Sequence, residues 1–158
     1  NGAVEFVAAA KLRGLHIAYS AAPFEEAVAL ALLPHCDLLI VNEGEATALV
    51  KATGTPAENL GLSHLVITKG AEGADYIGVN GAHHQPAFNV DAIDTTGAGD
   101  CFYGYFLAGL VANADISTIL REASAAAALQ VTKSGAATAI PLRQDVLDFI
   151  SANTNDLR

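Results

Sequence analysis

Three short apolar runs constrain the fold of this chain most strongly, because each has the length of one buried strand and each follows a helical stretch. The runs cover Leu15–Tyr19, Leu38–Val41 and Leu65–Thr68. The helical stretches that alternate with them are Ala3–Leu12, Phe24–Leu33 and Glu43–Lys51. Parallel strands need a long crossover between them, and a helix is its usual form. The first part of the chain is therefore predicted to be an α/β fold with a parallel sheet.

The pattern changes after Thr68. Asp75–Val79 and His83–Val90 predict a β-hairpin, with Asn80-Gly81 as a type I′ turn. Three helices are predicted after the hairpin, over Gly99–Val111, Ile116–Thr132 and Arg143–Ser151. We expect a Rossmann-type, mostly parallel sheet flanked by helices, with the hairpin added to it. The polar residues Asn153–Arg158 are expected to fray.

Composition excludes several classes of protein. The chain has 158 residues and a formal net charge of −9, which argues against binding of nucleic acid or an anionic membrane surface. No apolar run reaches the roughly 18–20 residues that span a bilayer. Cys36 and Cys101 are far apart and fit no metal or redox spacing, so a reducing, cytoplasmic setting is expected.

One segment has the residue types of a phosphate site. Asp94-Thr95-Thr96-Gly97-Ala98-Gly99-Asp100 follows a predicted strand and opens a long apolar helix. Backbone amides at a helix N-terminus bind anions, and small residues let a ligand approach them closely. The amides of Gly97, Ala98 and Gly99 could therefore hold a phosphoryl group, while Asp100 could accept a proton from a hydroxyl. From this segment alone, Asp100 as a simple helix cap remains an alternative.

Four segments in order resemble the PfkB/ribokinase family of carbohydrate kinases. Asp94–Gly104 resembles the C-terminal signature of that family, and Asn42-Glu43-Gly44-Glu45 resembles its Asn-x-x-Glu motif. Val66–Gly73 resembles the nucleotide-binding strand and loop, and Val131–Pro141 resembles the loop near the base and a monovalent cation. Together these segments extend the resemblance over nearly the whole chain.

The resemblance implies a ribokinase-like fold and transfer of a phosphoryl group from ATP to a hydroxyl of a small sugar. Asp100 would be the general base that contacts the substrate, with Gly97, Ala98 and Gly99 as the anion hole. Asn42 and Glu45 would organise Mg²⁺ indirectly. Residues implied to contact the nucleotide are Asn42, Thr68, Lys69, Gly70, Ala71, Glu72, Gly73, Gly99 and Ser124. Ser124 stands where relatives often carry His or Asn.

The resemblance also implies a site for a monovalent cation such as K⁺. Its ligands would be Asp94 and Thr96, with carbonyl groups of Gln130, Lys133 and Gly135. Ala139 stands where ribokinases often place Ser, so this site would have one side-chain oxygen fewer. The need for K⁺ therefore stays open.

Family members are about twice as long, as the resemblance implies. Residues 1–158 would correspond to the C-terminal nucleotide-binding and catalytic part, without the N-terminal sugar-binding and lid part. The full-length protein is expected to be a homodimer acting on a small sugar, without nucleic acid or membrane. The alternatives are a kinase of the same fold for a nucleoside, a fructose phosphate or a keto-sugar acid, and a non-catalytic nucleotide-binding module.

Overall fold

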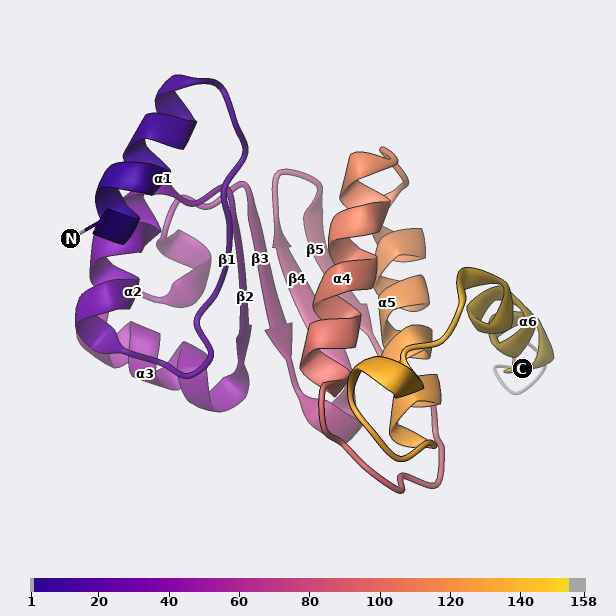
Figure 1. The fold of residues 1–158 in the computed structure, drawn as a ribbon. Helices are drawn as coiled ribbons and strands as arrows, with labels where there is room; N and C mark the ends of the chain where they lie inside the picture. The colour runs from indigo at the N-terminus through magenta and orange to yellow at the C-terminus, as the bar shows by residue number, and fades with distance from the viewer. Residues whose placement is uncertain (1, 154–158) are drawn as a thin grey trace. The chain divides into compact units, whose positions relative to one another are not determined.

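The structure is a computed structural model that describes residues 2–153. The chain divides into two compact units, one of residues 1–69 and 75–82 and the other of residues 70–74 and 83–158. The strands, labelled in Figure 1, are β1 (Ala18–Ser20), β2 (Leu38–Asn42), β3 (His64–Thr68), β4 (Ala74–Gly78) and β5 (Gly81–Gln85). The helices are α1 (Gly2–Leu12), α2 (Glu26–Leu32), α3 (Glu43–Thr53), α4 (Ala98–Val111), α5 (Ile116–Val131) and α6 (Arg143–Asn153).

The first unit contains the three parallel strands that the sequence predicts, although β1 covers Ala18–Ser20 instead of the predicted Leu15–Tyr19. β2 pairs in parallel with β1 on one side and with β3 on the other, and Leu39 is in register with Leu65. The first four residues of β2 are all buried, as expected for a central parallel strand covered on both faces. Helices α1, α2 and α3 lie side by side along the strands (Figure 1). The predicted α/β fold is thus confirmed, and the five strands follow the order β1-β2-β3-β4-β5.

The predicted hairpin is present, but its turn and its second strand differ from the prediction. Gly81 has φ +90°, whereas Asn113 is the only non-glycine residue with positive φ in the described part of the chain. A type I′ turn centred on Asn80-Gly81 would need positive φ at both residues, so that prediction is wrong. β5 ends at Gln85 instead of Val90, because Pro86 has no N–H to continue a ladder.

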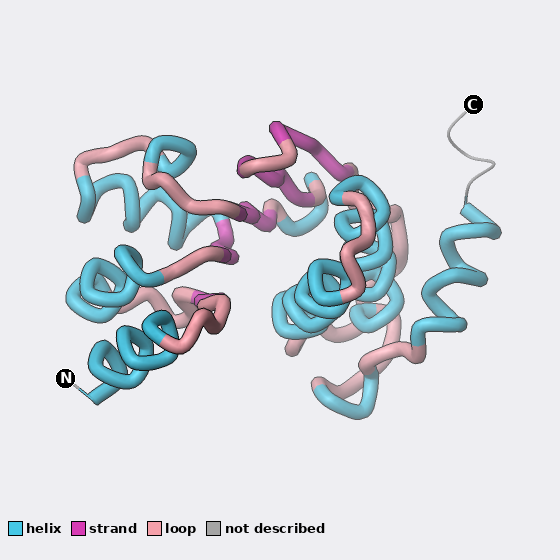
Figure 2. Tube along the Cα trace, turned by 90° about the horizontal axis from the view of Figure 1, so that it is seen from above, coloured by secondary structure: helices cyan, strands magenta, loops and turns pink. Residues whose placement is uncertain are grey.

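Helices dominate the second unit, as the tube in Figure 2 shows from above. α5 packs against both α4 and α6. Cys101, Ala125, Ala126 and Val146 form a buried cluster there, where the small residues of α5 let the helices approach closely. α6 ends at Asn153, and the rest of the tail predicted to fray lies outside the described residues. Among the described helices, none has the length and apolarity to cross a bilayer.

Candidate active site

Gly97 sets the backbone turn that starts α4. It is the N-cap residue and has φ +77°, in the left-handed region that favours glycine. A Cβ atom at this position would lie 2.8 Å from Gln130 Nε2. A side chain here would therefore be strained twice, by its own backbone and by its neighbour. The prediction of a tight glycine turn before this helix is confirmed.

The first turn of α4 presents the groups that the sequence assigned to phosphate and proton transfer. Gly97 provides no side-chain cap, so the amides of Gly99 and Asp100 in this turn are not capped. The amide of Ala98 donates to the Thr95 carbonyl at 3.2 Å. Gly99 and Asp100 are exposed, and a Cβ atom at Gly99 would meet no atom within 4 Å. A ligand can thus reach both this helix N-terminus, a kind of site that can bind anions, and the Asp100 carboxylate.

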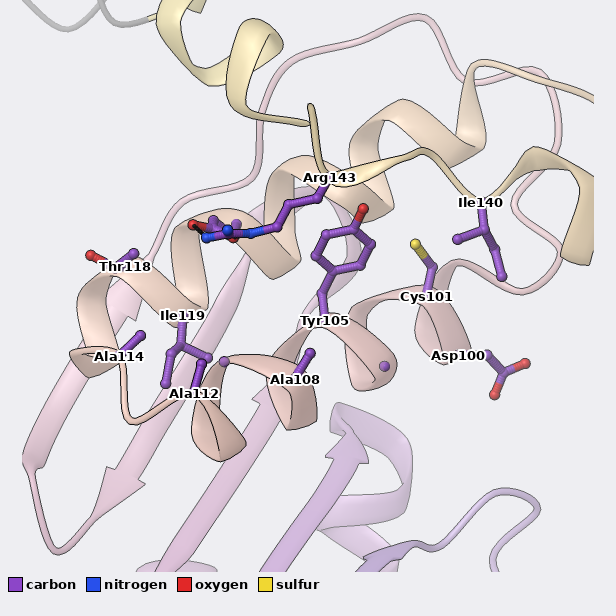
Figure 3. Close-up of a pocket in the computed structure, with 13 residues that line it drawn as sticks. Asp100, Cys101, Tyr105, Ala108, Ala112, Ala114, Thr118, Ile119, Ile140 and Arg143 are labelled. Atoms are coloured by element: carbon purple, nitrogen blue, oxygen red, sulfur yellow. Dashed lines mark hydrogen bonds and ion pairs between the residues drawn. The ribbon is translucent and has the colours of Figure 1, made fainter. Parts of the chain in front are cut away.

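A pocket of about 520 Å³ runs beside α4 and α5 in the second unit (Figure 3). Asp100 lies at one end of it, and its carboxylate points in a different direction from the thiol of the neighbouring Cys101. Arg143 on the wall forms a bidentate ion pair with Glu122, at 3.0 and 3.1 Å. Apart from Asp100, the pocket residues were not predicted as site residues. Burial raises the pKa of the Cys101 thiol to about 11, so this thiol is a poor nucleophile at neutral pH.

Asp94 joins the segment before α4 to the loop after α5. Its Oδ1 accepts the Thr96 N–H and its Oδ2 accepts the Gly135 N–H, each at 2.9 Å. The hydrogen bond from Gly135, followed by those from Thr96, lowers the pKa of Asp94 to about 2. Asp94, Thr96 and Gly135 therefore lie together, as the sequence predicts, and Lys133 lies in the same loop.

Gln130 was predicted only for its backbone carbonyl, but its side chain has a role that the sequence analysis missed. The side chain is fully buried, and Nε2 donates to the Thr96 carbonyl at 2.9 Å. The only sequence signal for this contact is a single amide side chain within the apolar stretch that closes α5.

Asn42 and Glu45 lie in the first unit, where β2 passes into α3. Asn42 Oδ1 accepts the Glu45 N–H at 2.9 Å, and Glu45 Oε2 accepts the Asn42 N–H at 2.8 Å. This capping box explains the motif by helix stability alone. It also holds the Glu45 carboxylate at the carboxyl end of β2, the edge where parallel sheets bind ligands.

The end of β3 lies next to Asn42, because Thr68 is its register partner in the neighbouring strand. Lys69 follows and forms a 2.6 Å ion pair with Asp75. Of the loop residues implied to contact the nucleotide, Gly70, Ala71 and Glu72 form a short 3-10 turn in the second unit. A Cβ atom at Gly73 would lie 2.0 Å from the Gln85 carbonyl oxygen, so packing against the end of β5 already requires glycine there.

Ser124 differs from the other predicted nucleotide contacts, because it is only 8% exposed in the middle of α5. Its role stays a prediction. The predicted site residues thus fall in both units, with Asn42, Glu45, Thr68 and Lys69 in the first and the others in the second.

A family model described as pfkB family carbohydrate kinase matches residues 4–143. The chain therefore belongs to the pfkB family of carbohydrate kinases, as the four motifs indicated. It is 34% identical over 152 residues to a ribokinase from Haemophilus influenzae, covering 89% of this chain and 49% of that protein. It is 29% identical over 161 residues to a deoxyribokinase from Salmonella typhi, covering 96% of this chain and 52% of that protein.

Solved structures agree with this family. The nucleoside kinase of Burkholderia thailandensis in complex with inosine is 27% identical, with a TM-score of 0.85 over 94% of this chain and 52% of that one. An E. coli chain in complex with ATP and Mg²⁺ is also 27% identical, with a TM-score of 0.79 over 92% of this chain and 52% of that one. The chain spans about half the length of the relatives that it matches.

Proposed function

We propose that the protein to which this chain belongs transfers the γ-phosphoryl group of ATP to a hydroxyl of a small sugar, in the manner of a ribokinase. The observation that carries this proposal is the exposed Asp100 carboxylate in the same helix turn as the uncapped Gly99 amide. One group can accept a proton where the other can hold an anion, and phosphoryl transfer needs both at one place.

In the proposed reaction, the acceptor hydroxyl attacks the γ-phosphorus in line with the departing ADP. The bond from the acceptor oxygen to phosphorus forms, and the bond from the γ-phosphorus to the β–γ bridging oxygen breaks. The hydroxyl proton passes to the Asp100 carboxylate. The amides around Gly97, Ala98 and Gly99 stabilise the negative charge on the transferred group.

The donor set at Asn42 and Glu45 fits indirect binding of Mg²⁺. Glu45 uses Oε2 in the capping box, so that its second carboxylate oxygen would hold a metal-bound water. Mg²⁺ prefers oxygen ligands and keeps several waters, and it would supply charge neutralisation at the nucleotide phosphates. Residues 68–73 and Ser124 would line the nucleotide in this proposal, with Lys69 near the phosphates.

We also propose an arrangement for the whole protein. Residues 1–158 would be its C-terminal nucleotide-binding and catalytic part, and most contacts that select the sugar would come from another part. The full-length protein would be a cytoplasmic homodimer without nucleic-acid or membrane partners. Two free cysteines are consistent with a reducing compartment.

A nucleoside is the second candidate acceptor, because the B. thailandensis nucleoside kinase, solved with inosine, matches this chain with a TM-score of 0.85. The test is a coupled ADP-release assay on the full-length gene product with ATP and Mg²⁺. Ribose, deoxyribose, fructose, fructose phosphate, 2-keto-3-deoxygluconate, adenosine and inosine are offered separately. Turnover with ribose or deoxyribose supports the sugar kinase, and turnover only with a nucleoside supports the second candidate. ATP binding without turnover would point to a non-catalytic module.

Asp100→Asn tests the proposed base. The variant should lose about 10²–10⁴-fold in kcat, while ATP binding measured by calorimetry stays close to that of the parent. Asp91→Asn is the matched control, because Asp91 is an exposed aspartate on the segment that leads into α4 and has no proposed role. Full turnover of Asp100→Asn would refute the assignment of the base.

A further inference from the structure

The side chain of Gln130 connects two segments that flank the proposed anion hole. Its Nε2 lies 2.9 Å from the Thr96 carbonyl oxygen and 3.5 Å from the Ala136 carbonyl oxygen. Both neighbours can only accept, so the nitrogen end of the amide must face them. Thr96 directly precedes the Gly97 turn, and Ala136 lies in the loop after α5. The contact therefore holds the entry to α4 against the end of α5 by a side chain that is itself fully buried.

Further hydrogen bonds, from backbone groups and from the Asp94 carboxylate, join the segment before α4 to the end of α5 and the loop after it. The N–H groups of Ile93 and Asp94 donate to the Val131 carbonyl, at 2.7 and 3.1 Å. Asp94 Oδ2 accepts the Gly135 N–H. All of these residues belong to the second unit, so the connection is internal to it. The two segments are thus joined by groups of the chain itself.

Three of the five residues implied to bind a monovalent cation, Asp94, Thr96 and Gln130, accept hydrogen bonds through their implied oxygens. Thr96 accepts from the Gln130 side chain, both carboxylate oxygens of Asp94 accept backbone N–H groups, and the Gln130 carbonyl accepts the Lys133 N–H at 3.0 Å. Ala139 has no side-chain oxygen to add. A cation needs oxygens directed at it, whereas the hydrogens of the Gln130 amide carry partial positive charge toward the same carbonyl. These residues do not fit K⁺.

We propose that the Gln130 side-chain amide takes the place of a monovalent cation, so that phosphoryl transfer in this protein does not depend on K⁺. A bound cation would hold the Thr96 carbonyl, and through it the Gly97 turn, by its charge. The Gln130 amide holds the same carbonyl by hydrogen bonding. Gln130 is a positioning residue and does not touch the substrate. This inference rests on the proposed function only where the rate of phosphoryl transfer is measured. The effect of K⁺ on thermal unfolding can be measured without turnover.

The first experiment compares the full-length gene product in KCl and in tetramethylammonium chloride at equal ionic strength. Thermal unfolding and ADP release with the best acceptor are both measured. We expect the same Tm in both salts and rates that agree within about twofold, because a cation that does not bind the native state cannot stabilise it.

Gln130→Glu is the informative variant, since it keeps the shape and replaces the donor with an oxygen. A carboxylate oxygen would then face the carbonyls of Thr96 and Ala136, and at a pH where this carboxyl is ionised a cation would be needed to hold the set together. We expect a lower Tm than the parent in tetramethylammonium and a recovery of Tm in KCl, with a rate that rises at least about fivefold with K⁺. Gln144→Glu is the matched control, because it makes the same change of charge at another site. Gln144 lies on α6, where its side chain donates a hydrogen bond to Asp148. This control variant should respond equally to both salts.

The parent protein decides the proposal even if a variant does not fold. A parent Tm or rate that rises clearly with K⁺ would overturn it and would indicate that the buried Gln130 Oε1, which accepts no hydrogen bond from the described residues, ligates a cation. Gln130→Ala is the second variant, because it frees the same carbonyls without adding charge, and we expect it to gain K⁺ sensitivity. If no acceptor is phosphorylated, the proposed function fails while the Tm comparison still tests the role of Gln130.

Discussion

Asn42 and Glu45 cap the first turn of α3 reciprocally, with each side chain accepting the backbone N–H of the other residue. The motif assigned to Mg²⁺ therefore has a structural role that is independent of any ligand. Substitutions can separate the two roles, because glutamine at the third helical position also completes a capping box. The charge of Glu45 can thus be removed while the geometry of the cap is kept.

Glu45→Gln should leave the free energy of unfolding within about 0.5 kcal/mol of the parent, because the box is kept. The same variant should need at least about fivefold more Mg²⁺ for half-maximal rate, since the carboxylate charge is gone. Urea titration and a Mg²⁺ titration of the ADP-release rate measure the two effects. An unchanged Mg²⁺ requirement would leave the helix cap as the role of Glu45.

Asn42→Ala should destabilise the protein by about 1 kcal/mol, as the loss of an N-cap side chain usually does. Asp115→Ala is a matched control, because Asp115 caps α5 by accepting the Thr118 N–H at 3.0 Å and has no proposed role in nucleotide binding. Both variants should lose similar stability in urea, and only Asn42→Ala should also weaken the dependence on Mg²⁺. Equal activity of the two variants would argue against a ligand role for Asn42.

Gly97→Ala and Gly99→Ala should have opposite effects on stability. Gly97 has positive φ and its Cβ would press on Gln130 Nε2, so alanine should cost about 1–2 kcal/mol or more. Gly99 is a helical residue with open space around its Cβ position, so alanine should stabilise α4 by about 0.5–1 kcal/mol. Urea denaturation of the two variants measures this difference.

Phosphoryl transfer should nevertheless fall in both glycine variants. At Gly99 the methyl group would occupy the space through which a phosphate approaches the amides, and we expect kcat/KM to fall at least about tenfold. If the Gly99→Ala protein is more stable and its kcat/KM is unchanged, Gly99 is not part of the anion hole.

Lys69→Met tests the loop lysine at the end of β3. The ion pair with Asp75 is partly exposed, and such pairs contribute about 0–1 kcal/mol, so stability should change little. If Lys69 also contacts the nucleotide phosphates, KM for ATP should rise severalfold. Lys51→Met on the exposed face of α3 is the control and should leave KM unchanged. The same KM for ATP in both variants would show that Lys69 forms its ion pair without contributing to nucleotide binding.

His64 should make the first unit less stable at acidic pH. Burial lowers the pKa of His64, and its Nδ1 lies 2.9 Å from the Tyr76 hydroxyl. Below about pH 6.5 the unfolded chain binds a proton that the native imidazole resists, so the free energy of unfolding should fall as pH decreases from 7.5 to 5. His64→Gln should flatten that dependence in urea titrations, whereas His84→Gln, at an exposed position, should not. If the free energy of unfolding changes equally with pH in the parent and in His64→Gln, His64 is not the origin of the pH dependence.

Local patterns were sufficient for the order of helices and strands. The bounds of β2, β3, α4 and α5 differ from the predictions by one residue at most, because buried runs, caps and glycines are encoded by neighbours in the chain. The end of β5 was predicted five residues too late, since an apolar alternation continues to Val90 although Pro86 cannot extend the pairing. The prediction of a type I′ turn was wrong because the Asn80-Gly81 pair permits that turn without requiring it.

The motifs of the family were also readable from the sequence, because catalysis needs particular residue types at short, fixed spacing. Asp100 with its glycines and Asn42 with Glu45 are such cases. Their partners in space were not readable. Gln130 and Thr96 are 34 residues apart, and nothing in the sequence states that a buried amide donates to that carbonyl. Only tertiary packing brings α5 against the entry to α4, and that contact decides whether the turn is held by a side chain or by a cation.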